Sequence, residues 1–439
     1  MGTGQELYNK AKKIIPGGTQ LLSKRPEMFL PDLWPAYYSK AKGCAVWDLD
    51  GNKYLDTCYM GIGSCVLGYA FEPVDNAAKA AMDSGVMCTL NAPEEVSLAE
   101  RLLDLHPWAQ MVRYCKGGGE AMAMAVRIAR AATGRDIVLF CGYHGWHDWY
   151  LSSNLRDANS LDTHLLAGLE PAGVPRGITG TSIPFVYNNT DEFLKLLSMY
   201  GDKAAAVVME PIRNDQPAEG FLQTIREETK KRGIALVFDE ITAGFRLTSG
   251  GSHKVFDIEP DIAVFAKAVA NGYPLSVVLG RSEVMSGAQK TFISSAFFTE
   301  RVSLAAADAA IDYHTEHKVW QTLIKTGERV QAGWKSAAAA AGLEIHVGGI
   351  FPLSHFSFKF DNKIDNPLTG KTYFTQEMLE RGYLAAPAFY ASLAHDNDVI
   401  ENYLQTASDV LMKMGEIKQR GDSFALKGPV CHAGFQRLN

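Results

Sequence analysis

Residues 234–241 read Ile-Ala-Leu-Val-Phe-Asp-Glu-Ile, an unbroken apolar run that ends abruptly in two carboxylates. A short run without polar alternation is typical of a strand that is buried on both faces, as in a parallel sheet. Similar runs occur at residues 137–140, 205–209, 261–265 and 276–279, and helical patterns lie between most of them. The spacing therefore predicts an α/β fold built on a mostly parallel, doubly wound sheet.

The remaining elements are predicted from apolar spacing and turn residues. Helices are expected at residues 97–105, 120–132, 222–232, 302–313, 319–341, 374–381 and 398–417, and further strands at 344–347 and 354–360. Asp50-Gly51-Asn52 predicts a hairpin between residues 44–49 and 53–56. Because prolines and glycines punctuate the first 40 residues, we expect an irregular arm there. Three segments are predicted. Residues 1–60 form an arm and hairpin that belong to a small domain, residues 61–315 form a large α/β domain, and residues 316–439 form the rest of the small α+β domain.

Composition narrows the class of protein. The 439 residues carry 43 basic and 49 acidic side chains, a net charge of −6, and no dense basic run, which disfavours a nucleic-acid partner. No apolar run approaches the roughly 18 residues of a membrane span, and no apolar segment near the start resembles a secretory signal. The seven cysteines form no C-x-x-C pair, so we expect reduced thiols in a cytoplasmic protein.

The first candidate for chemistry is the glycine run Lys116-Gly117-Gly118-Gly119, which stands before an Ala-rich helix. Glycines let the backbone approach a ligand closely, and the start of a helix offers unpaired N–H groups to a phosphate. Taken alone, such a run is more often an ordinary turn before a helix. It matches neither common nucleotide motif, so a nucleotide-binding protein is the weakest interpretation.

Two further candidates follow predicted strands. Asp239 comes at the end of residues 234–238, at the sheet edge where ligands bind, and its carboxylate suits a cationic ring nitrogen. Lys267 closes residues 261–267, and burial there would lower its pKa and favour imine formation. Each residue alone is also compatible with a structural role, as a helix cap or as a lysine that extends into water.

An aromatic cluster follows the strand at residues 137–140. Residues 141–149 read Cys-Gly-Tyr-His-Gly-Trp-His-Asp-Trp, and an aromatic ring at a strand end can stack on a flat cofactor. A packed aromatic corner is the structural alternative. His144 and His147 have no evident third ligand, so no metal site is expected.

One cofactor needs all four features together. Pyridoxal 5′-phosphate has a phosphate, a flat ring, a ring nitrogen that must stay protonated, and an aldehyde that forms an imine with lysine. The sequence therefore favours this cofactor, with its pyridoxamine form as the intermediate carrier of the amino group.

The chain resembles the class-III aminotransferases, fold-type I pyridoxal phosphate enzymes, and looks most similar to their glutamate-1-semialdehyde aminomutase-like branch. The resemblance extends over nearly the whole chain and rests on Gly43 and the following segments: 16–18, 46–51, 54–56, 61–63, 127–134, 143–145, 210–211, 239–241, 244–246 and 260–267. It implies that Lys267 forms the Schiff base and that Asp239 pairs with the pyridine nitrogen.

The resemblance also implies the remaining contacts with the cofactor. Ile241 and Tyr143 would lie on opposite faces of the ring, with His144 beside Tyr143, and the N–H groups of Gly118 and Gly119 would bind the phosphate. Family members form homodimers with shared active sites, so a homodimer is implied here.

The chain departs from the family pattern at the phosphate. The family's Ser-Gly-Thr loop is Gly117-Gly118-Gly119 here, so the hydroxyl contacts are absent. A threonine that relatives donate across the dimer interface aligns with Ala296, and Ser294 or Ser295 is a candidate substitute. For the substrate carboxylate, Arg25 and Arg213 are candidates, although solvated charge explains Arg25 equally well.

We therefore expect a pyridoxal phosphate-dependent aminotransferase that moves an amino group from a small amino donor to an aldehyde or ketone, sugar-like or keto-acid-like. One alternative is a glutamate-1-semialdehyde-type 2,1-aminomutase. Others are a racemase or lyase using the same residues, and a non-catalytic relative.

Overall fold

The computed structural model describes residues 2–164, 167–360 and 366–434, which belong to two compact units. The central unit is Glu72–Trp320, and the terminal unit combines Met1–Phe71 with Gln321–Asn439. Each unit has its own sheets.

The central unit is built on a seven-stranded sheet in the order β4-β10-β9-β8-β7-β5-β6. The strands are β4 (Met111–Cys115), β5 (Ile137–Cys141), β6 (Ser182–Pro184), β7 (Ala204–Met209), β8 (Ala235–Asp239), β9 (Ile262–Phe265) and β10 (Ser276–Gly280). The neighbours from β9 to β6 pair in parallel, as predicted.

Strand β10 is the exception, because it runs antiparallel to both β9 and β4. The expectation that residues 276–279 continue the parallel set is therefore wrong. The physical reason lies in the connection from β9: residues 266–275 contain only the short 3-10 helix η7 (Lys267–Ala270), and a parallel return requires a crossover of about a dozen residues or more.

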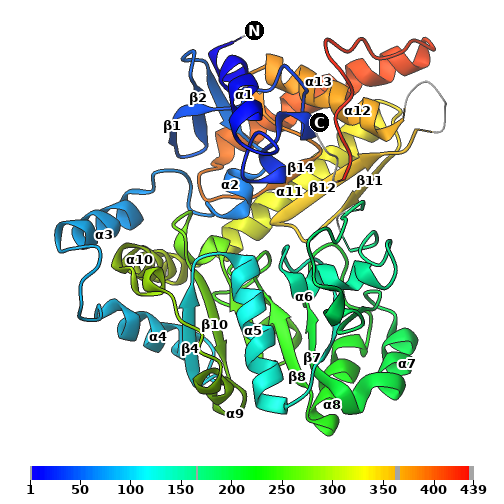
Figure 1. Ribbon diagram of the computed structural model, residues 1–439. Coiled ribbons are helices and arrows are strands. Elements are labelled where there is room, and N and C mark those ends of the chain that lie inside the picture. Colours follow the sequence, from blue (N-terminus) through cyan, green and yellow to red (C-terminus); the bar gives the residue numbers. More distant parts are fainter. Residues whose placement is uncertain (1, 165–166, 361–365, 435–439) are drawn as a thin grey trace. The chain divides into compact units, whose positions relative to one another are not determined.

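Helices cover the sheet on both faces (Figure 1). The helices of the central unit are α3 (Glu72–Asp83), α4 (Glu94–Leu105), α5 (Gly118–Thr133), α6 (Asp148–Leu151), α7 (Thr190–Tyr200), α8 (Phe221–Arg232), α9 (Ser282–Met285) and α10 (Arg301–Glu316). Side chains of β8 alternate between two cores: Val237 packs with α5, whereas Leu236 and Phe238 pack with α7 and α8. Burial on both faces explains the unbroken apolar run in the sequence.

The start of α5 is well defined, and it lies within the glycine run, with Gly117 as the cap. The side-chain oxygen Oε2 of Glu120 accepts hydrogen bonds from the backbone N–H groups of Lys116, at 3.0 Å, and Gly117, at 3.3 Å. The helix ends at Gly134, whose φ of 67° is left-handed and suits glycine. The backbone N–H groups at the first turn, from Gly118 onward, therefore open onto the carboxyl edge of the sheet.

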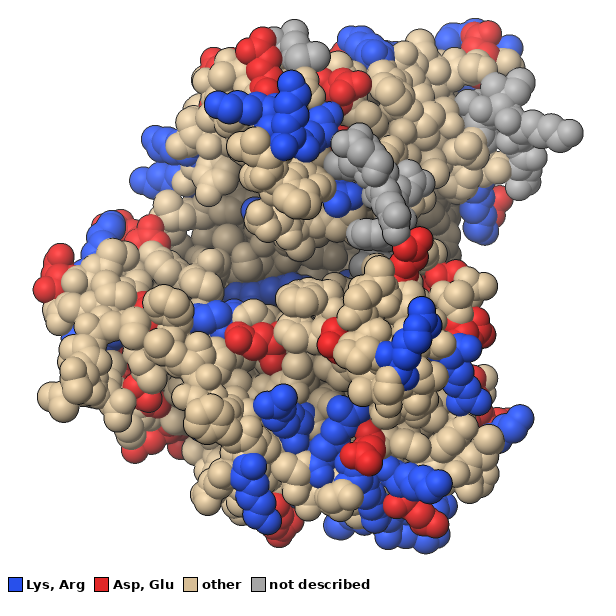
Figure 2. All heavy atoms as spheres, in the orientation of Figure 1, with Lys and Arg blue, Asp and Glu red and all other residues tan. Residues whose placement is uncertain are grey.

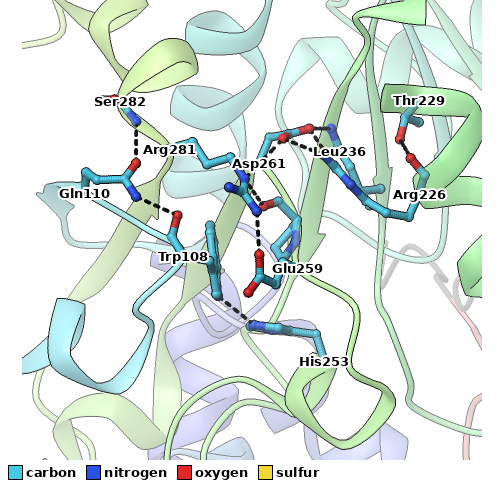
Figure 3. Close-up of polar contacts among 11 residues, drawn as sticks. Trp108, Gln110, Arg226, Thr229, Leu236, His253, Glu259, Asp261, Arg281 and Ser282 are labelled. Carbon is cyan, nitrogen blue, oxygen red and sulfur yellow. Dashed lines mark hydrogen bonds and ion pairs between the residues drawn. The ribbon is translucent and has the colours of Figure 1, made fainter. Parts of the chain in front are cut away.

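The amino edge of the sheet is held by Asp261, which precedes β9 (Figure 3). Its carboxylate oxygens accept two hydrogen bonds from the Arg226 guanidinium of α8, at 2.8 and 3.0 Å. Oxygen Oδ2 also accepts one from the backbone N–H of Leu236, at 2.8 Å. These contacts connect α8, β8 and β9 at the amino edge of the sheet. They therefore help to fix the position of β8 relative to β9, whose carboxyl ends lie at the opposite edge.

The terminal unit contains two smaller sheets, with strand orders β1-β2-β3-β13 and β11-β12-β14. Their strands are β1 (Tyr38–Lys42), β2 (Ala45–Asp48), β3 (Lys53–Asp56), β11 (Ile345–Gly348), β12 (Leu353–Phe358), β13 (Tyr383–Leu384) and β14 (Ala388–Tyr390). Its helices are α1 (Thr3–Ile14), α2 (Met60–Gly63), α11 (Val319–Ala340, mostly in this unit), α12 (Pro367–Glu380) and α13 (Asn397–Gln419). The predicted hairpin is confirmed by the antiparallel pairing of β2 with β3.

The expectation of an irregular arm over the first 40 residues is wrong, because residues 3–14 form helix α1. Tyr8 and Ala11 lie three residues apart on one buried face, and Lys12 and Lys13 stand near the carboxyl end. The prolines that suggested irregular structure begin only at Pro16, after the helix has ended.

Charges of both signs are interspersed over the face shown in Figure 2. None of the helices in the part of the chain that the structure describes is both long and apolar enough to cross a lipid bilayer.

Candidate active site

Four neighbouring strands of the central sheet carry polar side chains at their carboxyl ends. Strand β5 leads to Tyr143 and His144, β7 to Glu210, β8 ends at Asp239, and β9 leads to Lys267. Because β9, β8, β7 and β5 are adjacent and parallel, these ends meet at one edge of the sheet. This is the edge at which open α/β sheets bind ligands.

Asp239 and His144 form a buried pair, with exposed fractions of 3% and 1%. His144 Nδ1 lies 2.8 Å from Asp239 Oδ2, and His144 Nε2 lies 3.0 Å from the carbonyl oxygen of Cys141. A carbonyl oxygen only accepts, so Nε2 carries a hydrogen and donates it.

The other carboxylate oxygen of Asp239 is also fixed. Oδ1 accepts a hydrogen bond from the backbone N–H of Ile241, at 3.0 Å. With both oxygens engaged, the carboxylate is held in one orientation, which is what a contact with a single ring nitrogen requires.

Lys267 is half-buried, and its Nζ donates a hydrogen bond to Thr242 Oγ1 at 2.8 Å. Burial, together with the positive charges of Arg213 and Arg246, lowers the pKa of Lys267 from 10.5 to about 8, although Glu210 and Asp239 act in the opposite direction. Such a lysine is neutral in roughly a tenth of molecules at pH 7, against less than about a thousandth for an ordinary lysine. Its amine is therefore prepared to act as a nucleophile.

The backbone at Lys267 is left-handed, with φ of 50°. This conformation is uncommon for a residue with a long side chain, and strain of this kind is frequent at functional sites.

Glu210 and Arg213 add a second buried charge pair. Arg213 Nη1 lies 3.2 and 3.3 Å from the two carboxylate oxygens of Glu210. Burial raises the pKa of the Glu210 carboxyl, with Arg213 opposing and Asp239 reinforcing the shift. Sequence reasoning did not assign Glu210 to the site, although its position directly after a buried strand is the same signal that singled out Asp239.

The glycine run, residues 117–119, and the aromatic cluster, residues 141–149, approach each other backbone to backbone. A Cβ on Gly118 would lie 3.0 Å from Cδ1 of Ile241, and a Cβ on Gly145 would lie 2.8 Å from Cα of Gly119. Side chains at these glycines would occupy the space beside the first turn of α5. The arrangement leaves a cradle of helix N–H groups next to Ile241, which is two residues after Asp239.

Three further predicted site residues have surroundings of other kinds. Tyr143 is half-buried and packs edge-on against Tyr150, with ring centroids 5.9 Å apart. Ser295 is exposed and lines a surface groove of about 490 Å³ together with Ser294. Arg25 belongs to the terminal unit, where its guanidinium packs against Gly17.

The residues present fit pyridoxal phosphate. The cradle at Gly118 and Gly119 suits a phosphate, Asp239 suits a pyridine nitrogen, and Lys267 suits an aldehyde. These features define the class of protein as a pyridoxal phosphate-dependent enzyme of fold type I.

The sequence profile of the class-III aminotransferases matches residues 31–353, and the chain belongs to that family. It is 30% identical over 430 residues to a glutamate-1-semialdehyde 2,1-aminomutase of Syntrophobacter fumaroxidans, covering 94% of this chain and 98% of the relative. It is 27% identical over 427 residues to a 3-aminobutyryl-CoA aminotransferase of Cloacimonas acidaminovorans, covering 95% and 98%.

Solved structures agree. The FumI protein of Sphingopyxis sp. MTA144, in its PLP internal aldimine form, superposes with a TM-score of 0.84 at 25% identity and covers 95% of this chain and 98% of its own. An omega-transaminase from Sphaerobacter thermophilus has the same fold, with a TM-score of 0.83 at 24% identity, and covers 94% and 98%. The chain is thus a pyridoxal phosphate-dependent enzyme of the class-III aminotransferases, as its sequence predicts.

Proposed function

We propose that this chain moves an amino group from a small amino donor to an aldehyde or ketone at the carboxyl edge of the central sheet. The observation that carries the proposal is the low pKa of Lys267 beside the buried Asp239–His144 pair. Bound pyridoxal phosphate supplies the carbonyl that accepts the amino group and the ring that delocalises electrons from the substrate carbon.

Lys267 has two tasks in this proposal. Its neutral amine would hold the cofactor through the aldehyde, and once free the same amine would carry a proton from the substrate α-carbon to the cofactor carbon C4′. Thr242 orients Nζ through the 2.8 Å hydrogen bond, so the lysine remains aimed at the site in both tasks.

Asp239 would hold the proton on the cofactor's ring nitrogen, and His144 orients its carboxylate through the 2.8 Å contact. Ile241 and Tyr143 would bound the two faces of the ring, and the N–H groups of Gly118 and Gly119 would bind the phosphate. The close packing of Ile241 against Gly118 supports the assignment of Ile241, because it places an aliphatic side chain directly beside the cradle.

Arg213 and Arg25 are the proposed contacts for a substrate carboxylate. Arg213 is the stronger candidate in the central unit, since it already binds the carboxylate of Glu210 at the site. A substrate carboxylate would either displace Glu210 from Arg213 or bind Arg213 together with Glu210. Replacing Arg213 by methionine would then raise KM for donors with a carboxylate more than for simple amines.

An intramolecular 2,1-aminomutase is the second candidate, and it is favoured by the 30% identity to an enzyme of that name. Turnover of a single amino-aldehyde substrate without any separate amino donor would establish this reading. Amino-acid racemisation or elimination without net amine transfer would indicate the racemase or lyase alternative instead.

A homodimer with shared active sites is also proposed. Two segments of the central unit expose large apolar side chains, which are Val86, Met87, Leu90, Val96, Phe292 and Phe297. Phe292 is 95% exposed and Leu90 80%, and apolar patches of this kind mark protein interfaces. In the dimer, Ser295 of the partner subunit would supply the phosphate hydroxyl that Ala296 lacks.

We further propose a cytoplasmic location, which the seven free cysteines support because thiols persist in reducing compartments.

The experiment that tests the proposed function is an absorbance spectrum of the purified protein, followed by borohydride reduction and peptide mass mapping. We expect a visible band and reduced cofactor attached to Lys267. Protein that stays colourless and unlabelled after incubation with pyridoxal phosphate would contradict the enzyme reading and favour the non-catalytic relative. Protein in the aminated form would absorb nearer the ultraviolet, resist borohydride, and be tested with carbonyl acceptors.

A further inference from the structure

The phosphate cradle has an unusual neighbour where the side chain of residue 119 would begin. A Cβ built on Gly119 would lie 3.1 Å from Nδ1 and 3.3 Å from Cε1 of His147. The nitrogen-bearing edge of this imidazole therefore occupies the space that a hydroxyl side chain at position 119 would use.

The ring of His147 is held in this place. Its backbone carbonyl accepts hydrogen bonds from the N–H groups of Tyr150, at 2.9 Å, and Leu151, at 3.1 Å, so the residue caps α6. Its ring stacks on Trp146, with centroids 4.4 Å apart and planes inclined by 26°. Contacts on the backbone and on one ring face restrict where the imidazole can point.

Nδ1 of His147 is buried and has no hydrogen-bond partner among the described residues. Burial also lowers the pKa of His147, which favours the neutral ring. An unpaired buried nitrogen is costly, and native proteins retain few of them unless a ligand or an ion completes the contact. The nitrogen lies beside the first turn of α5, where the helix offers its N–H groups to an anion.

We propose that His147 donates a hydrogen bond from Nδ1 to the phosphate of the cofactor, in place of the hydroxyl that Gly119 lacks. The inference rests on the proposed function, because it assumes that pyridoxal phosphate binds at this edge. The donor is the neutral ring with its hydrogen on Nδ1, and the phosphate oxygens are acceptors.

Affinity measurements separate a phosphate contact from a general effect on the site. The cofactor-free protein and its His147→Ala variant are titrated with pyridoxal 5′-phosphate and with pyridoxal, which lacks the phosphate, and binding is followed by tryptophan fluorescence. We expect the variant to bind pyridoxal phosphate about ten- to a hundredfold more weakly, as a lost hydrogen bond to a charged group implies. Its affinity for pyridoxal should change less than about twofold, since hydrogen bonds elsewhere in the site remain.

His317→Ala is the matched control, because His317 also stacks on an aromatic ring of the central unit, Tyr313, with centroids 3.9 Å apart. This variant should bind both ligands as the parent does. The ³¹P resonance of the bound cofactor should shift in His147→Ala and stay unchanged in His317→Ala. Equal loss for both ligands, or no loss for pyridoxal phosphate, would overturn the inference.

A double-mutant cycle with Gly119→Ser adds a test of position. In the parent, the new Cβ meets His147 at 3.1 Å, so Gly119→Ser should weaken binding of pyridoxal phosphate. In His147→Ala the space is free, so the serine hydroxyl should recover at least about tenfold of the lost affinity. If the losses of pyridoxal phosphate affinity caused by the two substitutions simply add in the double variant, the inference is overturned.

Failure of the proposed function would look different from failure of this inference. If borohydride labels Lys267 in the parent with pyridoxal phosphate, the proposed function stands whatever the His147 variants do. If cofactor-free protein incubated with pyridoxal phosphate gives no labelled lysine in any variant, the proposed function itself fails.

Discussion

Replacing Lys267 by methionine tests the electrostatic account of the site, because methionine keeps much of the length and removes the charge. The lysine's pKa falls from 10.5 when unfolded to about 8 when folded. A difference of 2.5 pKa units corresponds to about 3 kcal/mol, which is the amount by which the protonated amine destabilises the folded state below pH 8.

The sign follows from proton binding. Between pH 8 and 10.5 the unfolded chain binds more protons at this lysine than the folded chain, so the free energy of unfolding rises with pH through that window. Below pH 8 both states are protonated and the full cost persists. The parent should therefore gain about 2 to 3 kcal/mol from this lysine between pH 7 and pH 10, whereas Lys267→Met should gain none of it.

At pH 7 the variant also loses the hydrogen bond to Thr242, which is worth about 1 kcal/mol. We therefore expect cofactor-free Lys267→Met to be about 2 kcal/mol more stable than the parent at pH 7, and equal or less stable at pH 10. Urea unfolding of both proteins at one fixed concentration measures this difference, with Lys230→Met, an exposed lysine of α8, as the control. An identical stability difference at the two pH values would refute the reasoning.

Three further results are expected. Gly145→Ala should lower the free energy of unfolding by about 3 kcal/mol, because φ at Gly145 is 99° and the new Cβ would meet Gly119. The control Gly134→Ala, where φ is 67° and the space is open, should lower it by about 1 kcal/mol. Equal shifts in the melting temperatures of the two variants would contradict this. Asp239→Asn should lower the single-turnover rate of amine transfer about 100-fold while borohydride still labels the protein, and an unchanged rate would argue against a ring-nitrogen contact. Phe292→Asp should shift the mass by light scattering from twice 48.0 kDa toward 48.0 kDa, and a parent that is already monomeric would contradict the proposed dimer.

Much of the fold could be predicted from local patterns. Strands β5, β7, β8 and β9 and helices α5 and α8 lie within a few residues of their predicted bounds, because apolar periodicity and glycine ends act over only a few positions. Elements with weak local signals were missed. Strand β4 carries the polar Arg113 in its middle, and β6 is a three-residue edge strand that ends in proline.

Candidate cofactor contacts could be predicted for the same reason. Asp239 and Lys267 each follow an unbroken apolar strand, and parallel strands place such residues at one edge whatever the details of packing. The sequence by itself therefore determined the class of cofactor and offered Asp239 and Lys267 as two candidate residues to hold it.

Only the tertiary structure decided which side chains meet across that edge. The contact between His144 and Asp239 joins residues 95 positions apart, and the approach of His147 to Gly119 joins the start of α6 to the first turn of α5. The antiparallel course of β10 likewise depends on a connection too short for a crossover. Contacts between side chains that are far apart in the sequence arise from the packing of their segments, and local periodicity carries no information about that packing.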